Sequence, residues 1–551
     1  MSLLIQAIKK RVPAFAAVAA ALVGLVNIAS ALTPDIRWRG HLLLEFEPVE
    51  AIRLFHALAL PAGAALLLVA PYLAKRRRRA LQTAVALMIA LGLFNLLKGL
   101  DFEESILTWG VAGVLILSRD AFTVRHDPNT LRSAVWRVPV LALIGLAIAM
   151  VAVWTGTHAG FGTVVTETFD LLRYQPGPVH FHHHIPIGVH ALELGTLLMI
   201  AYVIFRPLTV PRAPASPAAR QVAADLVRAH GADTLAFFKL RGDGNYIFSE
   251  DGRAFVAYAI ENGVLLLSGD PVGPPDALPG LLHQVREFAD ARGLKLGALG
   301  ASERLCPLYE ELGLHSIYLG DEAVVELGRF SLEGRPIRKV RQSVTRLSKA
   351  GYGAELHDLR ELDQDTIERV EEVVELGRQG APERGFSMAM DSLQGEHDHE
   401  TLVVLARDET GAIRGVLHFV PCYGRAAVSL SFMRRDPDTP NGLTEFLVVG
   451  AIELLRERGI DELSLNFAAF AKWMHSPEKR LERWLGKLIT LGNPFFQIES
   501  LYRFNAKFFP RWEPRFLVYE GTFGLPRAGI AAMWAEGQLP KPRIRRAPAA
   551  R

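Results

Sequence analysis

The run that decides the fold reads AAVSLSFMRRDPDTPNGLTEFLVVGAIELLRER, residues 426–458. Its first part mixes apolar and small polar side chains without a break, which predicts a strand over Ala426–Arg434. Prolines and the Asn441-Gly442 pair then mark a turn. Apolar side chains at helical spacing predict a helix over Thr444–Arg458. A strand, a turn and a helix in this order are typical of α/β or α+β folds.

The same alternation occurs twice in the C-terminal half. The further predicted strands are Ala254–Ile260, Val264–Ser268, Lys295–Leu299, Leu402–Arg407, Ile413–Pro421 and Glu462–Asn466, and the further predicted helices are Leu278–Arg292 and Glu303–Leu312. An antiparallel meander followed by a helix, present in duplicate, resembles acyltransferases of the GNAT type. The segment from Arg434 to Gly442 lacks the Arg/Gln-x-x-Gly-x-Gly/Ala pattern that holds coenzyme A in that type, so an acetyl-CoA donor is disfavoured.

Nearly all of the long uncharged runs lie in residues 12–206. The chain has 551 residues, of which 50 % are hydrophobic, and its mean hydropathy of +0.19 is high for a wholly soluble protein. Six runs approach the roughly 20 residues that cross a bilayer. They predict membrane spans at 13–32, 51–74, 80–97, 103–118, 137–155 and 186–205.

Lysine and arginine are unevenly distributed around these spans. With the N-terminus inside, fourteen lie on the cytoplasmic side and five on the opposite side, as the positive-inside rule requires. Because further spans follow it, the first run is expected to be an anchor and not a cleaved signal peptide. We therefore expect a multi-pass protein of the bacterial inner membrane, with both termini and the C-terminal half in the cytoplasm.

The loop before the sixth span carries His180 and His182–His184, with His158 and His190 nearby. Such a density of imidazoles suits a transition metal or pH sensing, but a polar external loop is the favoured interpretation because the ligand spacing is not fixed. Glu193 in the sixth span faces either the bundle interior or the interface. Neither a metal site nor a cofactor is predicted.

Composition shifts divide the chain into parts. Four prolines in residues 207–219 predict a semi-rigid linker. The predicted parts are a six-span membrane domain (1–206), the linker (207–219), a first GNAT-like domain (220–334), a second, catalytic GNAT-like domain (335–530) and a basic tail (531–551).

Cys306 and Cys422 have no metal-site spacing and suit a reducing cytosol. With 61 Lys and Arg against 58 Asp and Glu, the net charge of +3 gives no whole-chain indication of a polyanionic partner.

Four ordered segments resemble the lysyl/alanyl-phosphatidylglycerol synthase family, the multiple peptide resistance factors. They are Ser268–Gly273, Leu319–Ala323, Ser431–Phe446 and Tyr502–Arg515, within a match over roughly 225–525. The resemblance implies a tandem pair of GNAT-like domains that esterify phosphatidylglycerol with an amino acid delivered by aminoacyl-tRNA. It also implies lower negative charge at the membrane surface and resistance to antimicrobial peptides.

Two departures from the family pattern limit what the resemblance implies. Ser431 stands where lysyl and alanyl members are associated with an acidic residue, so lysine, alanine, ornithine and arginine all stay open. The membrane half is short and looks like the six-span module of actinobacterial members, so lipid translocation is not carried over.

The transfer itself needs positioned cations and amides, because the donor ester is already activated. The predicted catalytic residues are Arg434, Glu445 and Lys507. Arg434 is expected to bind a phosphate, and Glu445 either meets the α-ammonium group or acts as a base; its alternative role is to stabilise the helix N-terminus. Asn441 and Gly442 are expected to offer backbone amides to an anion, or merely to form the turn.

Two groups of cations are candidates for contacts with nucleic acid or lipid. Lys507, Arg511 and Arg515 are interleaved with aromatic residues, which suits the CCA end of tRNA or a lipid phosphate, with a basic rim around an aromatic core as the alternative. Six cations between residues 335 and 349 indicate a phosphate-backbone surface. The predicted substrate-binding residues are Asn441, Gly442, Arg511, Arg515 and Asn466, and the predicted tRNA-binding residues are Arg338, Lys339, Arg341, Arg346 and Lys349.

Other cationic segments have weaker interpretations. The stretches 471–474 and 479–488 combine tryptophan and leucine with cations, as helices at a membrane surface or in a core do, and the tail 541–551 is expected near anionic lipid. Asp270 and the Asp321-Glu322 pair are assigned to structure. The leading hypothesis is thus an aminoacyltransferase, and its alternatives are a GNAT-type acyltransferase that uses a thioester and a non-catalytic membrane transporter or regulator.

Overall fold

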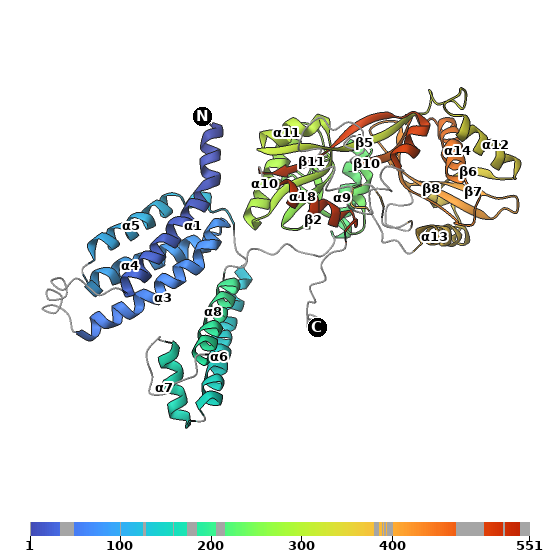
Figure 1. Ribbon diagram of the computed structural model, residues 1–551. Coiled ribbons are helices and arrows are strands. Elements are labelled where there is room, and N and C mark those ends of the chain that lie inside the picture. The colour runs from blue at the N-terminus through green and yellow to red at the C-terminus, as the bar shows by residue number, and fades with distance from the viewer. Residues whose placement is uncertain are drawn as a thin grey trace. The chain divides into compact units, whose positions relative to one another are not determined.

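The computed structural model describes most of the chain. The described residues are 2–32, 49–99, 101–124, 128–157, 159–172, 184–204, 215–379, 385–387, 389–390, 393, 400–469, 501–521 and 524–539. The chain forms two compact units (Figure 1). One spans Met1–Pro211 and the other spans Arg212–Arg551, except for Asp290–Gly293, which groups with the first.

The first unit is helical. Its helices are α1 (Ser2–Leu32), α3 (Val49–Ala74), α4 (Arg78–Gly99), α5 (Phe102–Leu117), α6 (Pro128–Thr157), α7 (Phe161–Leu172) and α8 (His184–Ile204). Each of the six predicted spans overlaps one of these helices almost completely. By length and composition, and among the described residues, three stretches can cross a membrane: Arg11–Ser30, Arg78–Leu97 and Trp136–Thr155. Ala62–Ala74 and Leu192–Ile204 are shorter apolar helices, so six-fold spanning remains a prediction.

The helix α7 was not expected. It lies within the predicted external segment between the fifth and sixth spans and buries Val164, Glu167 and Thr168. His158 and the tract from His180 to His183 lie outside the described residues. In α8 the ring of His190 is 3.7 Å from the carboxylate of Glu193, three residues on.

The second unit is built on one continuous sheet. Its strands are β1 (Asn245–Phe248), β2 (Phe255–Glu261), β3 (Val264–Ser268), β4 (Lys295–Ser302), β5 (Leu314–Glu326), β6 (Gly353–Asp358), β7 (Leu402–Arg407), β8 (Ile413–Cys422), β9 (Ala427–Arg435), β10 (Glu462–Ala469) and β11 (Arg511–Glu520). The described residues give the order β1-β2-β3-β4-β11-β5-β10-β9-β8-β7-β6. The expectation of an α/β fold for the C-terminal half is therefore confirmed, while its cytosolic location stays a prediction.

The two ends of the sheet repeat one plan. In the first half, β1, β2 and β3 are antiparallel and β4 runs parallel to β3 after the helix α10 (Leu278–Arg292). In the second half, β6 to β9 are antiparallel and β10 runs parallel to β9 after α14 (Leu443–Glu457). An antiparallel meander, a helix and a parallel strand are the elements of GNAT-like folds, here present twice.

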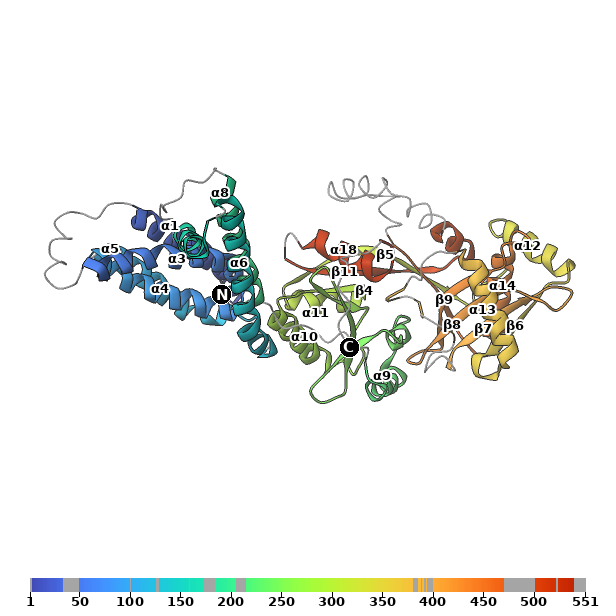
Figure 2. The ribbon, with the colours of Figure 1, turned by 90° about the horizontal axis from the view of Figure 1, so that it is seen from below.

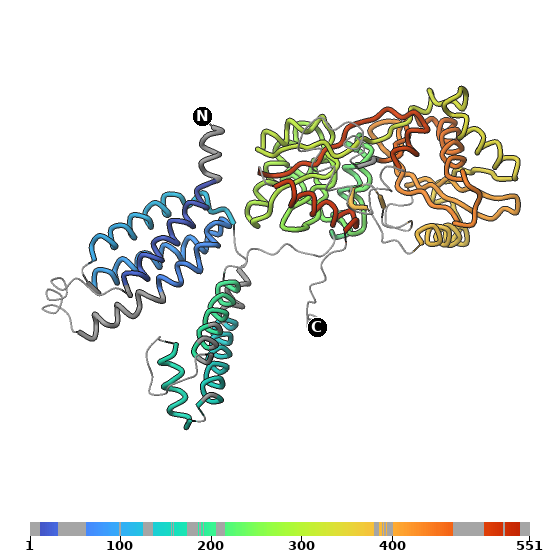
Figure 3. The backbone as a smooth tube through the Cα atoms, in the orientation of Figure 1, coloured from blue at the N-terminus to red at the C-terminus, as the bar shows by residue number. Residues whose placement is uncertain are grey.

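The middle of the sheet joins the halves. The long strand β5 pairs with β10 on one side and β11 on the other, and β11 also pairs with β4. Figure 3 shows the C-terminal chain, in red, returning among the first-half strands. The next helix, α18 (Leu525–Ala535), packs on β2, β3 and β11. The first half thus contains strand and helix from the end of the chain, while the predicted domain boundaries themselves stay predictions.

Helices cover the second half on opposite faces. The helix α14 shares an apolar core with α12 (Arg338–Lys349), while α13 (Gln364–Arg378) packs through a separate core on β8 and β9. Figures 1 and 2 show α13 on one side of these strands and α14 on the other. The helix α9 (Pro217–His230) begins inside the predicted linker, because the Ser216 hydroxyl accepts a hydrogen bond from the Ala219 amide at 3.2 Å and caps it.

Candidate functional site

The helix α14 begins at a glycine that no other residue replaces easily. Gly442 has a φ of +90° and forms the N-cap. A Cβ added to it would lie 2.6 Å from the hydroxyl oxygen of Ser343 in α12, so both the conformation and the approach of α12 require glycine. Backbone N–H groups and the positive end of the helix dipole make such a terminus suited to anions. The predicted Asn441-Gly442 position therefore stands at a helix N-terminus.

An ion pair lies over the first turn of α14. The Lys507 ammonium nitrogen donates to a Glu445 carboxylate oxygen at 2.7 Å, and it also lies 5.1 Å from the ring centroid of Phe504. The Lys507 side chain is 42 % exposed and the Glu445 side chain 19 %. The structure thus brings together two of the three predicted catalytic residues, in a position that solvent reaches.

The predicted tRNA-binding cations all lie on α12. Val340 and Leu347 are buried against the α14 core, while Arg338, Lys339, Arg346 and Lys349 are exposed. Among the residues of α12 there is no acidic side chain, so every charge on its exposed face is positive.

Two of these cations also tie α12 to its neighbours. The Arg346 guanidinium donates to the carbonyl oxygen of Asn441, and Arg341 donates to the carbonyl oxygen of Leu332 at 2.5 Å. An open hollow of about 400 Å³ is lined by Arg341, Gln342, Thr345, Arg346 and Lys349. The cationic face therefore continues directly to the N-terminus of α14.

Arg434 lies on the other face of the sheet. Its Cβ points toward Gly377 of α13, where a Cβ added to that glycine would be 3.2 Å away. Its guanidinium carbon is 6.0 Å from the ring centroid of Phe432, a side chain of the α13 core. The sheet separates Arg434 from the Lys507–Glu445 pair, so a single cluster of the three predicted catalytic residues, as expected from the sequence, is not observed.

The strands β9 and β10 are paired only along their first residues. The parallel register runs only from Ala427–Glu462 to Ser429–Ser464, and β10 then carries a register shift where it pairs with β5. Asn466 has a φ of +68° at this point, and its side-chain amide nitrogen donates to the Leu430 carbonyl oxygen at 3.1 Å. Next along β9, the Ser431 hydroxyl accepts from the Met390 backbone amide at 3.0 Å. The predicted residue Asn466 thus holds the two strands together where their ladder ends.

Arg511 belongs to a surface cluster of acids. Its guanidinium donates to Glu326 at 2.7 Å, to Glu462 at 2.8 Å and to Glu513 at 2.7 Å, and its side chain is 44 % exposed. These carboxylates are on β5, β10 and β11, so Arg511 crosslinks neighbouring strands.

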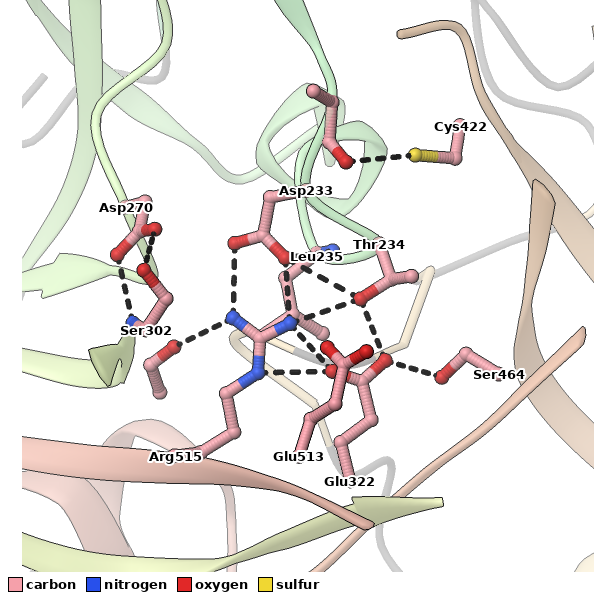
Figure 4. A network of polar contacts seen from close by, with 12 residues as sticks. Asp233, Thr234, Leu235, Asp270, Ser302, Glu322, Cys422, Ser464, Glu513 and Arg515 are labelled. Atoms are coloured by element: carbon pink, nitrogen blue, oxygen red, sulfur yellow. Dashed lines mark hydrogen bonds and ion pairs between the residues drawn. The ribbon is translucent and has the colours of Figure 1, made fainter. Parts of the chain in front are cut away.

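Arg515 is buried in the middle of the sheet (Figure 4). Its guanidinium donates to Asp233 at 2.6 Å and to Glu322, and it contacts the Thr234 hydroxyl at 3.0 Å. Glu322 in turn accepts from Thr234 at 2.6 Å and from Ser464. The expected cluster of Lys507, Arg511 and Arg515 is therefore divided: each cation is paired with different carboxylates.

Charge balance explains how this network tolerates burial. Burial alone would raise the pKa of Asp233, but the Arg515 guanidinium holds it well below its ordinary range. Burial and the charge of Asp233 raise the pKa of Asp270, whose carboxylate accepts from the Ser302 amide at 2.9 Å. Burial also lowers the pKa of Lys239. The acids Asp270 and Glu322, assigned to structure from the sequence, are internal partners of the fold.

Sequence reasoning missed His418. It lies on β8 at 0 % exposure, with its ring centroid 4.9 Å from that of Phe432, and neither ring nitrogen has a hydrogen-bond partner. Burial lowers the pKa of His418 to about 3. Every residue of β8 from 415 to 420 is buried, because helices cover both faces of this part of the sheet. The nearly unbroken apolar run around residue 418 was therefore the signal that placed it in the core.

The described residues contain no group of three or more His, Cys, Asp or Glu side chains arranged to hold a metal ion. Cys306 and Cys422 are free thiols. The segments 471–474 and 479–488, the linker up to residue 214 and the tail 541–551 lie outside the described residues.

Comparison with known proteins identifies the family. Residues 224–519 match the family described as phosphatidylglycerol lysyltransferase, C-terminal. The chain is 32 % identical over 484 residues to the lysylphosphatidylglycerol biosynthesis bifunctional protein LysX of Gordonia bronchialis, covering 81 % of this chain and 41 % of that protein. It is 30 % identical over 561 residues to LysX of Mycobacterium marinum, covering 97 % and 50 %. The chain therefore spans about half the length of these curated relatives or less.

Two solved structures share the fold of the second unit. The structure of L-PGS from Bacillus licheniformis has a TM-score of 0.53 at 21 % identity, covering 60 % of this chain and 99 % of that one. The C-terminal domain of a lysylphosphatidylglycerol synthetase from Agrobacterium fabrum has a TM-score of 0.51 at 26 % identity, covering 59 % and 96 %. With the family match over more than half of its length, this chain belongs to the lysylphosphatidylglycerol synthase family.

Proposed function

We propose that this protein transfers an aminoacyl group from aminoacyl-tRNA to phosphatidylglycerol, or to a related glycerolipid, at the cytoplasmic leaflet of the bacterial inner membrane. Membership of the family supports a transferase that acts on this lipid. The relatives are about twice as long as this chain, so the activity of the whole relative is a proposal for this one.

The main support for aminoacyl-tRNA as the donor is the position of α12 and its exposed cations. Its exposed cations, Arg338, Lys339, Arg346 and Lys349, are unopposed by any acid on the same helix. A surface whose charges are all positive favours a phosphate backbone. Arg346 reaches the carbonyl oxygen of Asn441 beside the first turn of α14, so a bound acceptor stem would end near the Lys507–Glu445 pair.

The proposed reaction is a transesterification. A glycerol hydroxyl oxygen of the lipid attacks the ester carbonyl carbon and forms the new C–O bond. The bond from that carbon to the ribose oxygen of tRNA breaks, and the proton of the lipid hydroxyl ends on the ribose oxygen. Because the donor ester is activated, the protein's contribution is to position both substrates and to stabilise the oxyanion.

The predicted residues take roles that follow their placement. On the α14 face, Glu445 meets the α-ammonium group or accepts the hydroxyl proton, Lys507 stabilises developing negative charge, and Asn441 and Gly442 offer the helix terminus to an anion. On the α13 face, Arg434 binds the lipid phosphate. We propose that the two substrates meet where β9 and β10 separate, at Asn466. The substrate-binding roles of Arg511 and Arg515 remain sequence predictions.

The membrane unit would keep the transferase at its acceptor. We propose six spans, with both termini in the cytoplasm, from the distribution of lysine and arginine. Adding an amino acid brings a cationic α-ammonium group to an anionic headgroup, which lowers the negative charge of the membrane surface and the attraction of cationic antimicrobial peptides.

Expression of the full chain in a host that lacks aminoacyl lipids tests this proposal. We expect a new ninhydrin-positive lipid whose mass identifies the amino acid, and its loss on Lys507→Ala. The matched control is Arg458→Ala, because the Arg458–Asp358 pair has the same 2.7 Å separation and similar exposure. A folded protein that yields no new lipid, or a Lys507→Ala variant that yields as much as the wild type, would contradict it.

A further inference from the structure

An exposed aromatic side chain, Phe509, lies two residues after Lys507 in the sequence. Phe509 follows the short 3-10 helix Ala506–Phe508 as its C-cap, with a φ of +52°. Its side chain is 58 % exposed, whereas that of Phe508 is 1 % exposed. Of two neighbouring phenylalanines in the same turn, one is thus buried and the other is exposed.

The backbone at Phe509 is in a conformation that a bulky residue avoids. The left-handed region crowds Cβ, and helix ends that use it usually carry glycine or asparagine. A strained residue persists only where the surrounding structure holds it, and such outliers gather at functional sites. Phe509 has neither a relaxed backbone nor a buried ring, so packing does not account for a phenylalanine at this position, and a binding role would.

The turn distributes three side chains in three directions. Lys507 donates to Glu445 on α14. Phe508 enters the core, where its ring centroid lies 5.4 Å from that of Phe504 and 6.3 Å from that of Phe330. Residues 507 and 508 are thus anchored on either side of the turn, and Phe509, which follows them directly, keeps its ring exposed to solvent.

We propose that Phe509 is the stacking platform for an unpaired nucleobase at the 3′ end of the tRNA donor. This inference rests on the proposed function and adds to it the recognition of a base. Every base offers a π-face, so an aromatic ring beside cations is the usual arrangement for binding single-stranded nucleic acid without sequence preference. The Lys507 ammonium would then face the reactive end of the same strand.

A lipid surface is the competing occupant, and the distribution of apolar side chains opposes it. Among the described residues of the second unit, the other large exposed hydrophobic side chains are Val222, Leu376, Tyr423 and Ile530. They belong to α9, α13, the turn after β8 and α18, and not to the Phe509 turn. Membrane-surface binding scales with buried apolar area, and one ring offers little of it.

The test measures transfer to phosphatidylglycerol by the full chain in mixed micelles, as aminoacyl-tRNA and lipid are varied separately. For Phe509→Ala and Phe509→Gly we expect the KM for aminoacyl-tRNA to rise about 5- to 150-fold, the range of base stacking on an aromatic ring, with kcat and the lipid dependence unchanged. Phe509→Tyr and Phe509→Trp should stay within about 2-fold of the wild type, because they keep the ring. Leu376→Ala, an equally exposed apolar side chain at 55 %, is the control.

Thermal unfolding separates strain from misfolding. Phe509→Gly removes the backbone strain, so we expect it to melt no earlier than the wild type while showing the raised KM. A Phe509→Ala variant with an unchanged KM for aminoacyl-tRNA would overturn the inference, and so would an altered lipid dependence alone, which would indicate membrane contact. If the wild type transfers nothing from aminoacyl-tRNA, the proposed function fails instead.

Discussion

Lys507 and Arg515 are cations of the same C-terminal segment, yet their surroundings differ completely. The Lys507 side chain is 42 % exposed and has one acidic partner over the first turn of α14. The Arg515 side chain is 3 % exposed and lies between Asp233 and Glu322. We propose that Lys507 meets a substrate, whereas Arg515 joins β11 to β5 and to the turn after α9.

The strand explains this difference. Residues 515 and 517 of β11 are both buried, so the alternation that places Leu517 in the core places Arg515 there as well. A buried guanidinium then requires buried carboxylates, which β5 and the turn after α9 supply. Lys507 precedes the strand, so no such constraint applies to it.

Replacement of Arg515 should have the largest effect on stability. Arg515→Met removes the guanidinium partner of Glu322, which is fully buried, and of Asp233, which is mostly buried. We therefore expect the free energy of unfolding to fall by roughly 3–5 kcal/mol. Arg511→Met, on the same strand but exposed, should cost no more than about 1 kcal/mol. Denaturant unfolding of the full chain in detergent measures both. Equal losses would contradict the contrast between a buried and a surface arginine.

Disruption of the Lys507–Glu445 pair should mainly affect catalysis. For Lys507→Ala and Glu445→Gln we expect kcat/KM for transfer to fall by about 10²-fold, the effect of removing one group that stabilises a transition state. Stability should change by less than about 1 kcal/mol, since the pair is near the surface. Arg458→Ala should leave the rate unchanged. An inactive Arg458→Ala, or a fully active Lys507→Ala, would argue against this assignment.

Replacement of His418 should change how stability depends on pH. In the folded protein the pKa of His418 is about 3, against about 6.5 in an unfolded chain. Between these values only the unfolded chain binds the proton, so stability falls as pH falls, by up to about 1.4 kcal/mol per pH unit. From pH 7 to pH 5, His418→Leu should lose about 2 kcal/mol less than the wild type. Identical pH profiles in denaturant unfolding would mean that His418 does not contribute.

Neutralisation of α12 should have the smallest effect. For each of Arg338→Gln and Arg346→Gln we expect the slope of log affinity for tRNA against log salt concentration to shrink by roughly one unit, with a few-fold weaker binding. Arg369→Gln, on the exposed face of α13, should leave the slope unchanged. Filter binding over a salt series is a suitable measurement, and an unchanged slope in the α12 variants would remove the case for this surface.

Local patterns predicted some elements to the residue. β3, α10 and β7 occupy the predicted ranges Val264–Ser268, Leu278–Arg292 and Leu402–Arg407, because each is a periodic apolar run bounded by turn residues. The strands β5 and β11 were not predicted, although they form the centre of the sheet. They carry the buried residues Glu322 and Arg515. A charged residue can be predicted to lie in the core only when its ion-pair partner is known, and here the partners are distant in sequence.

The site could be predicted in part for the same reason. The sequence indicated that Asn441, Gly442 and Glu445 stand at a helix start, since that relation is local. It did not show that Lys507 meets Glu445, that α12 packs against Gly442, or that Arg434 faces α13. Those relations depend on the order of the strands and on which face of the sheet each residue occupies. Local sequence patterns carry no information about either.

The nature of the donor distinguishes the proposed transferase most directly from a thioester-dependent enzyme. The purified full chain in phosphatidylglycerol micelles is supplied either with aminoacyl-tRNA carrying a labelled amino acid or with the same amino acid as a coenzyme A thioester. We expect label in the lipid from the tRNA donor alone, abolished when the tRNA is first digested with ribonuclease. Lipid labelling from the thioester, or labelling that survives ribonuclease, would contradict the tRNA-dependent function.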